Sequence, residues 1–446
     1  MDTEKRYQQA LDYLFSYVDY SLKHTDELVR AEFNLDRMVA LMHILGDPQN
    51  DYPTIHVAGT KGKGSTAAFL ESALEQQGYL TGLYTSPHLV DFCERIQVDR
   101  SNISHVELAD LVDEIKPAVD QVPFITTFEL TTALSFLYFS RRKVDVAVFE
   151  VGMGGRLDAT NILSPLLSVI TSISLDHTAV LGDTVALIAG EKAGIIKEGI
   201  PVVTSPQVPD ALDVIRKIAE QRHAPLTLVG EDWKFEETAS SLDGQEFKIW
   251  SNEEKTRKFH IRMLGFFQVQ NAATAYAALQ IARKRGLRIS EKSIKLGFEK
   301  TFWPARFEVV RKDPPIILDS AHNKDSFIKL HQALDEYFPG RKVILIFGVS
   351  EDKDVETMLS GMKPVLSNVI LTRSTHPRAL EPEKLISLAE KLGLPYISLP
   401  SVPDSFERAL ELSQESGDII LSAGSMFVTA EVRIAWLKYT NAWDYD

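Results

Sequence analysis

Short apolar runs alternate with stretches of helical periodicity along the first part of the chain. The runs are bounded by polar or turn-forming residues, which is the pattern of buried strands. They lie at residues 54–58, 80–84, 144–151 and 166–170. Helical spacing lies between them, at residues 65–77, 106–119 and 131–139. In the first of these helices Ala67, Leu70 and Leu74 share one face. Because strands that alternate with helices form strand-helix-strand units, we expect a mostly parallel, doubly wound α/β sheet.

The pattern changes from about residue 233 to residue 262, where polar and aromatic residues mix without a long helical period. A turn signal at Asp243-Gly244 predicts a small β excursion there. An alanine-rich helix over residues 268–285 follows, and after Pro304 the alternation restarts. The strands expected after the restart are 316–318, 343–347, 369–371 and 419–421, and the helices are 325–338 and 355–362.

This restart predicts a second, smaller α/β domain. At 446 residues the chain is also too long for one ordinary compact domain. We place the boundary near Lys300, so the predicted domains are residues 1–300, which include the β excursion, and residues 301–446.

Composition and charge narrow the classes of partner. The chain has 48 Lys and Arg against 62 Asp and Glu, a formal net charge of -14, which argues against nucleic acid or an anionic membrane as partner. The charged N-terminal segment contains no secretory signal, and nothing later approaches the roughly 20 apolar residues that span a bilayer. We expect a cytoplasmic monomer that acts on small molecules. Cys93 is the only cysteine; we interpret it as a buried or incidental thiol rather than a nucleophile.

The sharpest local motif is a glycine- and lysine-rich loop between the strand 54–58 and the helix that follows it. The loop reads Gly59-Thr60-Lys61-Gly62-Lys63-Gly64-Ser65. Its glycines allow a tight turn in which several N–H groups face one anion, and the helix N-terminus adds its dipole. Lys63 is then placed to reach a β- or γ-phosphate, while Ser65 or Thr66 caps the helix or supports a metal-bound phosphate. The motif is not a strict Walker A sequence, and the alternative interpretation is a flexible turn.

Polar side chains follow three further apolar runs. Glu150 ends the run 144–149, Ser86 lies just after the run 80–84, and His177 follows the run 166–170. Phosphates held at a sheet edge need a metal cation with hard oxygen ligands, so a carboxylate at a strand tip is a candidate ligand. Each residue taken singly also fits a simpler role, as an exposed strand end for Glu150 and as a cap or turn residue for Ser86 and His177.

A second glycine-rich segment, residues 152–157, follows the strand that ends at Glu150 and suggests a dinucleotide site. It has Leu157 in place of the third glycine, and no acidic residue ends a second strand about twenty residues further on. The sequence therefore argues against a nicotinamide enzyme.

Taken together, these motifs resemble the folylpolyglutamate synthase/dihydrofolate synthase branch of the Mur ligase superfamily. The resemblance rests first on residues 56–65, 85–89 and 150–161. Later motifs fall in the family's order, at residues 176–178, 191–197, 271–275, 303–308, 318–323, 376–379 and 423–425. The resemblance implies a P-loop NTPase-like first domain and a Rossmann-like second domain.

The resemblance also implies a ligase that uses ATP and two magnesium ions. The loop residues Gly59, Thr60, Lys61, Gly62, Lys63, Gly64 and Ser65 would hold the phosphates. Ser86, Glu150 and His177 would coordinate magnesium. Lys192 matches the family lysine that becomes carbamylated and then holds a second ion. On the nucleotide, Asn271 would contact adenine, Arg306 the γ-phosphate and Asp319 the ribose side.

The substrates implied are L-glutamate and a folate or dihydropteroate. His322 and Ser425 are candidates for the incoming glutamate, and Lys63, Lys192, His322 and Arg306 are the expected catalytic residues. Arg156 and Phe128 are assigned to substrate binding. Phe124 and residues 127–129 could contribute to the pterin side, although a core role is an equal alternative for each aromatic residue.

The sequence departs from the family pattern near the nucleotide. Lys61 replaces an expected Asn, Phe267 replaces a His, Ala305 and Ser320 replace glycines, and Lys324 replaces a Pro. Lys61 adds a charge beside the expected triphosphate, and Phe267 removes a polar contact near adenine. Nucleotide affinity is therefore the property that these departures put in question.

The implied chemistry is activation of a carboxylate as an acyl phosphate, followed by attack of the glutamate amine. Nucleotide residues in both domains imply that closure assembles the catalytic centre and keeps water out. Two alternatives remain: a Mur ligase acting on a UDP-linked peptide, and a non-enzymatic nucleotide sensor of the same fold. No evident UDP-binding domain precedes Gly59, which argues against the first, and the presence of Lys192, His322 and Arg306 argues against the second.

Overall fold

The computed structural model describes residues 3–19, 34–252, 254–351 and 353–442. The chain divides into two compact units. Unit 1 comprises the described residues up to Ala239 together with 246–262 and 267–301, and unit 2 comprises 240–245, 263–266 and the described residues from Phe302 onward. The main segment of unit 2 thus starts two residues after Lys300. Within the described ranges, no helix is both long and apolar enough to cross a membrane.

Unit 1 is built on an eight-stranded sheet with the strand order β4-β3-β2-β5-β1-β6-β7-β8. The strands are β1 Thr54–Ala58, β2 Thr81–Tyr84, β3 Ile96–Val98, β4 Ser101–Asn102, β5 Val146–Glu150, β6 Leu167–Ile170, β7 Val202–Thr204 and β8 Leu226–Leu228. In this order the six strands β2, β5, β1, β6, β7 and β8 pair in parallel. At one edge, β3 pairs antiparallel with both β2 and β4. Every residue of β1 and β5 is buried, as expected for central strands covered on both faces.

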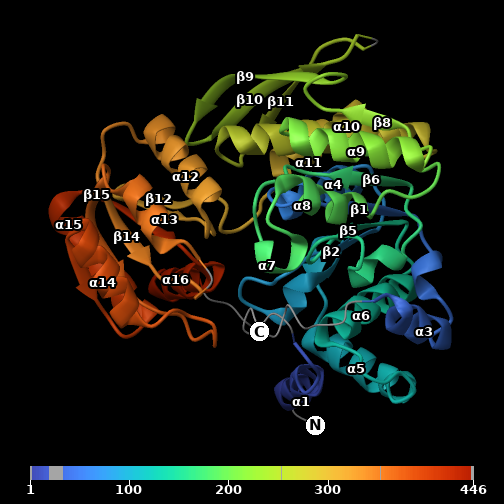
Figure 1. Cartoon of the computed structure of the whole chain (residues 1–446), viewed down its shortest axis with the longest axis horizontal. Helices are drawn as coiled ribbons and strands as arrows, with labels where there is room; N and C mark the ends of the chain where they lie inside the picture. The colour runs from blue at the N-terminus through green and yellow to red at the C-terminus, as the bar shows by residue number, and fades with distance from the viewer. Residues whose placement is uncertain (1–2, 20–33, 253, 352, 443–446) are drawn as a thin grey trace. The chain divides into compact units, whose positions relative to one another are not determined.

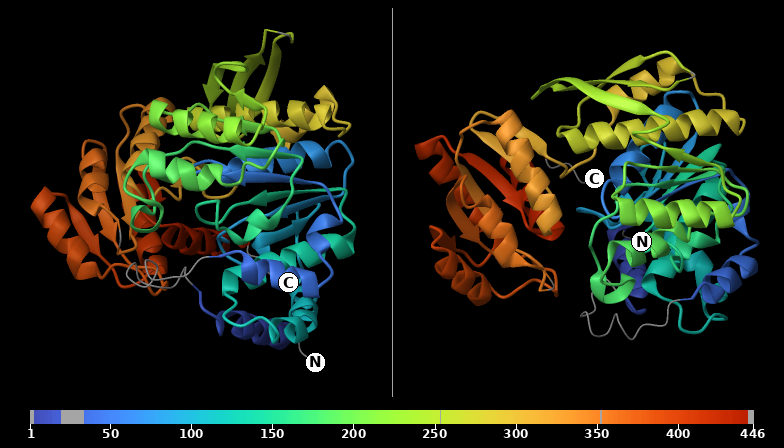
Figure 2. Two further views of the ribbon diagram at one scale, coloured as in Figure 1. Left: turned by 45° about the vertical axis from the view of Figure 1, so that its right-hand side comes forward. Right: turned by 45° about the horizontal axis from the view of Figure 1, so that its top comes forward.

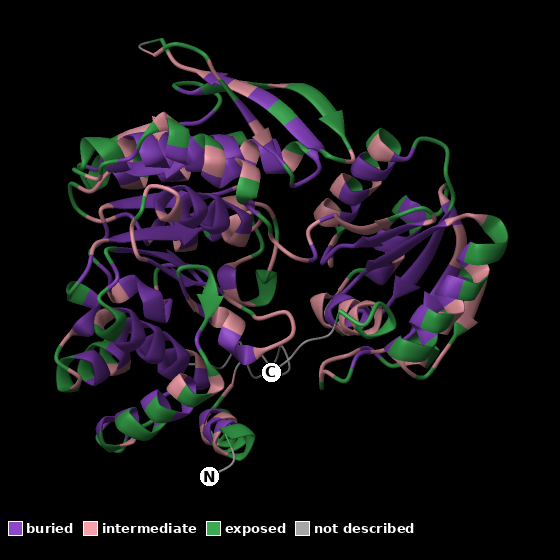
Figure 3. Cartoon of the chain, turned by 180° about the vertical axis from the view of Figure 1, so that it is seen from behind, coloured by how far each residue is buried: buried purple, intermediate pink, exposed green. Residues whose placement is uncertain are grey.

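Helices cover both faces of this sheet (Figure 1). They are α1 Thr3–Phe15, α3 Asp36–Ile44, α4 Lys63–Glu75, α5 His105–Val119, α6 Thr127–Arg142, α7 Thr178–Leu181, α8 Val185–Ala193, α9 Pro209–Gln221, α10 Phe266–Lys284 and α11 Glu291–Lys300, with short 3-10 turns η1 Pro48–Asn50, η2 Phe92–Arg95 and η3 Ala159–Ile162. The helices α4 and α11 pack together on one face, and α5 and α6 lie on the other. The buried strands stand out in Figure 3.

The predicted β excursion is a three-stranded sheet with the order β11-β10-β9. Its strands are β9 Lys234–Ser241, β10 Gly244–Trp250 and β11 Arg257–Ile261. The turn between β9 and β10 contains Asp243, and Gly244 has the positive φ of 139° that the turn signal anticipated. The projecting ribbon is seen from two further directions in Figure 2.

Unit 2 has a six-stranded sheet with the order β12-β13-β17-β14-β15-β16. Its strands are β12 Glu308–Lys312, β13 Pro315–Leu318, β14 Val343–Phe347, β15 Leu366–Leu371, β16 Tyr396–Ser398 and β17 Ile419–Ala423, and its helices are α12 Lys324–Tyr337, α13 Val355–Met362, α14 Pro382–Leu392, α15 Val402–Ser416 and α16 Met426–Tyr439. Only β12 runs antiparallel to its neighbour. Leu345 and Phe347 pack into one core and Ile344 and Ile346 into another, so this sheet is also covered on both faces.

The predicted fold class is confirmed, with a parallel P-loop-type sheet in the first unit and a smaller α/β sheet in the second. One helix start was predicted wrongly. The helix expected from residue 131 begins at Thr127, because Thr126 and Glu129 form a reciprocal capping box that fixes the start four residues earlier. The periodicity alone did not reveal this cap.

Candidate active site

The glycine- and lysine-rich loop lies between β1 and α4, at the carboxyl edge of the sheet of unit 1. Gly62 has a φ of 87° and forms the N-cap of α4, which begins at Lys63. A Cβ atom on Gly62 would lie 2.2 Å from Oδ1 of Asn271, and one on Gly59 would lie 1.8 Å from Oγ1 of Thr171. Only glycine fits these two positions, so the backbone of the loop packs directly against Asn271 and the end of β6.

The side chains at the strand ends converge on this loop. The Nζ atom of Lys63 lies 3.9 Å from Oε1 of Glu150, the last residue of β5. The backbone N–H of Ser86 donates to Oε2 of the same carboxylate, at 3.3 Å. Glu150 is buried. The structure therefore brings together the loop lysine and two of the predicted metal ligands, Ser86 and Glu150.

Lys192 lies near the C-terminus of α8 and is buried. The pKa of its amine is lowered to about 7, chiefly by burial and also by the nearby Lys63 and Lys61 ammonium groups, while Asp176 and Asp158 oppose the shift. An amine with this pKa is substantially neutral at physiological pH, whereas an ordinary lysine is not. Lys192 thus has the protonation behaviour expected of a reactive lysine.

The third predicted metal ligand, His177, is exposed and forms the N-cap of the short helix α7 with a φ of 49°. Its neighbour Asp176 forms an ion pair with Lys61, with 3.2 Å between Oδ2 and Nζ. Sequence reasoning assigned no role to Asp176. The available signal was its position, directly before His177 and just after an apolar run.

The segment after Glu150 is held in place by Asp158, another residue without a predicted role. Its Oδ2 atom accepts hydrogen bonds from the backbone N–H groups of Gly152 and Met153, both at 3.0 Å. Arg156 is exposed, and its guanidinium pairs with Glu191, which precedes Lys192. These contacts fix the glycine-rich segment against the residue pair 191–192, so Arg156 lies beside the buried lysine.

Two phenylalanines differ in their surroundings. Phe128 is partly buried, and a Cβ on Gly152 would lie 2.6 Å from its ring, so Phe128 stands beside the segment that follows Glu150. Phe124 is 88% exposed, with a φ of 62°. The alternative that Phe124 is a core residue is wrong, because the left-handed turn directs it into solvent.

Four predicted site residues lie in unit 2, near the carboxyl ends of β13 and β17. Asp319 follows β13 and accepts hydrogen bonds from the backbone N–H groups of Phe307 and Ala321, both at 2.7 Å. His322 Nδ1 lies 2.8 Å from the carbonyl oxygen of Ser320. Ser425 is the N-cap of α16. Arg306 is partly buried and its Nη1 donates to the carbonyl oxygen of Ala305. Unit 2 therefore gathers Arg306, Asp319, His322 and Ser425 at one end of its sheet.

A phosphate group and a magnesium ion fit the residues of unit 1. The loop is a cradle that a Cβ would fill, and the buried hydroxyl of Thr66, in the first turn of α4, has no hydrogen-bond partner among the described residues. A carboxylate and a serine hydroxyl are hard oxygen ligands of the kind that magnesium prefers. The donor set therefore suits a metal-bound phosphate.

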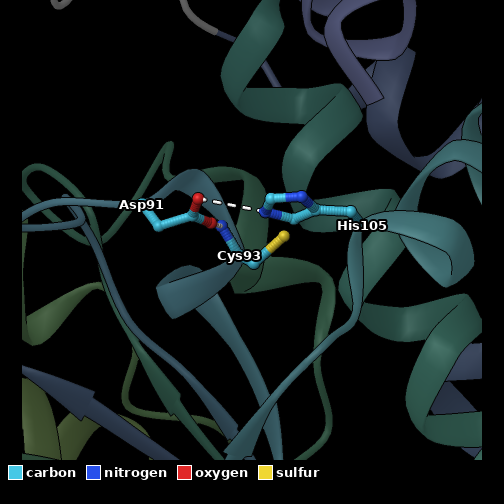
Figure 4. Close-up of side chains that lie close together, drawn as sticks. All are labelled: Asp91, Cys93 and His105. Carbon is cyan, nitrogen blue, oxygen red and sulfur yellow. Dashed lines mark hydrogen bonds and ion pairs between the residues drawn. The ribbon is translucent and has the colours of Figure 1, made fainter. Parts of the chain in front are cut away.

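A second polar cluster of unit 1 consists of Asp91, Cys93 and His105 (Figure 4). His105 Nε2 lies 3.2 Å from Asp91, and Nδ1 lies 3.2 Å from Glu4. The ring of Tyr7 stacks on that of His105, with centroids 3.6 Å apart. Cys93 is buried, which raises the pKa of its thiol well above the usual range. This cluster joins α1 to η2 and α5, and the prediction of a buried thiol is confirmed.

Comparison with known proteins places both units in one family. The Mur ligase middle domain matches residues 57–279, and the Mur ligase glutamate ligase domain matches residues 305–426. The dihydrofolate synthase/folylpolyglutamate synthase of Bacillus subtilis is 36% identical over 434 residues, which cover 96% of this chain and 98% of that protein.

Solved structures agree over nearly the whole chain. Mycobacterium tuberculosis folylpolyglutamate synthase complexed with ADP matches with a TM-score of 0.87 and 30% identity, covering 97% of this chain and 98% of that one. Escherichia coli FolC in complex with DHPP and ADP matches with a TM-score of 0.84 and 30% identity, again covering 97% and 98%.

Proposed function

Because this chain belongs to the folylpolyglutamate synthase/dihydrofolate synthase family of the Mur ligases, we propose that it joins L-glutamate to the carboxylate of a folate or dihydropteroate at the expense of ATP. The resemblance and the ligase class predicted from the motifs are confirmed by these relatives. The observation that carries the proposal is the approach of Lys63 to Glu150 at the sheet edge, with the buried Lys192 of α8 near enough to be affected by the charge of Lys63, in a chain similar to these ligases over nearly its whole length.

We propose that the loop from Gly59 to Ser65 holds the ATP phosphates. The support is its backbone geometry: Gly62 is the N-cap of α4, so the first turn of that helix, whose N–H groups have no intrahelical partners, begins within the loop. Asn271 packs against Gly62, which suits a role beside the adenine. The roles of Arg306 at the γ-phosphate and of Asp319 at the ribose are proposals that rest on the motif match.

The proposed metal ligands are Ser86, Glu150 and His177, with Lys192 as a carbamate. Magnesium would supply positive charge opposite the phosphates when bound. The lowered pKa of Lys192 favours carbamylation, since only a neutral amine reacts with carbon dioxide. Carbamylation of the neutral amine would also place an anion beside the Lys61 and Lys63 ammonium groups, which attract it.

The carboxylate of the acceptor is a poor electrophile, so transfer of the γ-phosphoryl group of ATP to it creates a leaving group for attack by the glutamate amine. Lys63 would neutralise charge on the transferring group. We assign His322 and Ser425 to glutamate, and Phe128 and Arg156 to the acceptor. This assignment is supported by Phe128, which lies beside Gly152, and by Arg156, which pairs with Glu191, the residue before Lys192.

The test is turnover by the purified protein with ATP, magnesium and L-glutamate, with dihydropteroate in one series and tetrahydrofolate in another. Phosphate release and the mass of the glutamylated product are measured. We expect release with at least one acceptor, and the ratio of the two rates decides between dihydrofolate synthase and folylpolyglutamate synthase activity. A protein that released phosphate with neither acceptor would contradict the proposal.

A further inference from the structure

The phosphate loop is joined by backbone contacts to the segment that follows β6. The N–H groups of Thr60 and Lys61 both donate to the carbonyl oxygen of Ser172, at 2.9 and 3.0 Å. The hydroxyl of Thr60 donates to the carbonyl oxygen of Ser174 at 3.1 Å and accepts from the N–H of the same residue at 3.2 Å. Any shift of this segment is therefore transmitted to the start of the loop.

A side-chain contact continues this connection to the residue before His177. The ammonium of Lys61 lies 3.2 Å from Oδ2 of Asp176, with side-chain exposures of 19% and 10%. The other oxygen of Asp176 accepts from the backbone N–H of His177 at 3.1 Å. One carboxylate thus bridges Lys61 and the backbone of His177.

His177 needs such support because its backbone is in the left-handed region, with a φ of 49°. This conformation costs a residue with a Cβ about 1 kcal/mol and persists only where surrounding contacts hold it. Asp176 also acts on Lys192 with the sign opposite to that of Lys61. The pair is thus part of the electrostatic surroundings of the buried lysine.

We propose that Lys61 is a positioning residue, whose ion pair with Asp176 holds the segment 172–177 against the phosphate loop and so fixes His177 relative to Lys63. This inference rests on the proposed function, in which His177 is a metal ligand. It changes the expected role of Lys61 from a phosphate contact to a tether. Residues that orient metal ligands typically affect metal affinity roughly tenfold or more.

The two roles predict different results for Lys61→Met and Asp176→Asn. If Lys61 is a tether, either variant removes the ion pair, so both should weaken Mn²⁺ binding to the ATP-loaded protein roughly tenfold. The double variant should then bind Mn²⁺ little more weakly than either single variant. As a phosphate contact, Lys61→Met alone should weaken binding of ATP without metal, and Asp176→Asn should strengthen it by removing a negative charge.

Mn²⁺ affinity is measured by electron paramagnetic resonance and ATP affinity without metal by calorimetry. The matched control is Lys116→Met, which breaks a 2.7 Å ion pair with Asp113 on α5 and should change neither affinity. Thermal melting shows whether each variant folds. Opposite effects of the two variants, or no effect of either, would overturn the tether while leaving the ligase proposal intact. A wild-type protein that bound no ATP would instead contradict the proposed function.

Discussion

Two polar clusters of unit 1 contain ionisable groups in partly buried surroundings, but the charges that surround these groups differ. Around the phosphate loop, Lys61, Lys63 and Lys192 gather, and burial together with the neighbouring cations lowers the pKa of Lys192 to about 7. In the cluster of Figure 4, His105 lies between the carboxylates of Asp91 and Glu4, and Tyr7 donates to Asp91. In the first cluster Lys61 and Lys63 each face a carboxylate, but both also raise the positive charge around the buried Lys192. In the second cluster the imidazole of His105 and the hydroxyl of Tyr7 each face a carboxylate.

This difference distinguishes a candidate active site from a cluster that only stabilises the fold. Buried like charges destabilise a fold unless a ligand compensates them, so their presence indicates selection for binding or catalysis. Groups that satisfy one another contribute to folding instead. The Asp91 cluster contains atoms of the kinds that bind metals, but the imidazole of His105 and the carboxylate of Asp91 already have partners within the fold.

The sharpest way to break the comparison is Lys192→Met. The proposed catalytic role predicts loss of ligation by about a hundredfold or more. The same change should stabilise the fold at pH 6. The pKa of Lys192 is lowered in the folded state, so the folded protein holds its proton less tightly than the unfolded chain. The resulting destabilisation of the fold is complete below pH 7 and decreases as the pH rises toward 10.5, the usual pKa of a lysine amine.

We expect a gain in the free energy of unfolding on the order of 2 kcal/mol at pH 6, measured by urea denaturation. Lys116→Met on α5 serves as the matched control, since its side chain is 40% exposed, and should change neither quantity appreciably. Retention of ligation in the Lys192 variant would remove this residue from the site. A loss of stability at pH 6 would show that its charge is compensated in the fold.

The Asp91 cluster should give the reverse result. Asp91→Asn weakens the contact with His105 and the cap of η2, where Oδ1 accepts from the N–H of Cys93 at 2.7 Å. We expect roughly 2 kcal/mol lower stability with an unchanged rate of ligation per folded molecule. His105→Gln should behave alike. A fall in kcat without a fall in stability would mean that the cluster belongs to the site.

The sequence allowed the proximity of the candidate site residues in unit 1 to be predicted because each follows an apolar run. Parallel strands bring their carboxyl ends to one edge, so Lys63, Ser86 and Glu150 had to approach one another once the alternation was recognised. The bounds of β1 and β14 and of helix α13 also follow from the pattern alone. Strand order and family motifs thus determine much of the site.

What the sequence did not reveal depends on contacts between distant residues. Asp176 becomes the partner of Lys61 only in the folded chain, 115 positions apart. The cluster of Asp91, Cys93 and His105 requires α1 to dock beside η2, and neither spacing nor periodicity encodes that docking. Phe124 appeared compatible with a core, but its φ of 62° turns it outward. Side-chain pairing and local turns are therefore the features that required the structure.

Helix α4 contains residues of both kinds, because it begins at Lys63 in the candidate site and carries the buried Glu71 in the core. Burial raises the pKa of Glu71 to about 7, although its bond to Thr81 and the charge of Arg100 oppose the shift. The folded state therefore binds a proton more tightly than the unfolded chain, and stability falls as pH rises from about 4.5 through 7.

Glu71→Gln should remove that pH dependence because an amide does not titrate. The amide oxygen can still accept the hydrogen bond from the Thr81 hydroxyl. We expect roughly 1 kcal/mol higher stability at pH 8 and little change at pH 5, followed by thermal melting at the two values. Ligation should be unaffected, which distinguishes this scaffold carboxyl from Glu150. An equal effect at both pH values would contradict the assigned titration.

The smallest expected effect concerns metal at the Asp91 cluster. A tetrahedral Co²⁺ ion bound there would need the Cys93 thiolate and the Nε2 atom of His105. Burial opposes ionisation of that thiol, and Nε2 already faces Asp91 at 3.2 Å. We therefore expect no sulfur-to-cobalt charge-transfer band when the purified protein is titrated with Co²⁺ at neutral pH. A band that appears at one equivalent and disappears in Cys93→Ser would show that mutually satisfied side chains can still be recruited by a metal, and would end the distinction drawn between the two clusters.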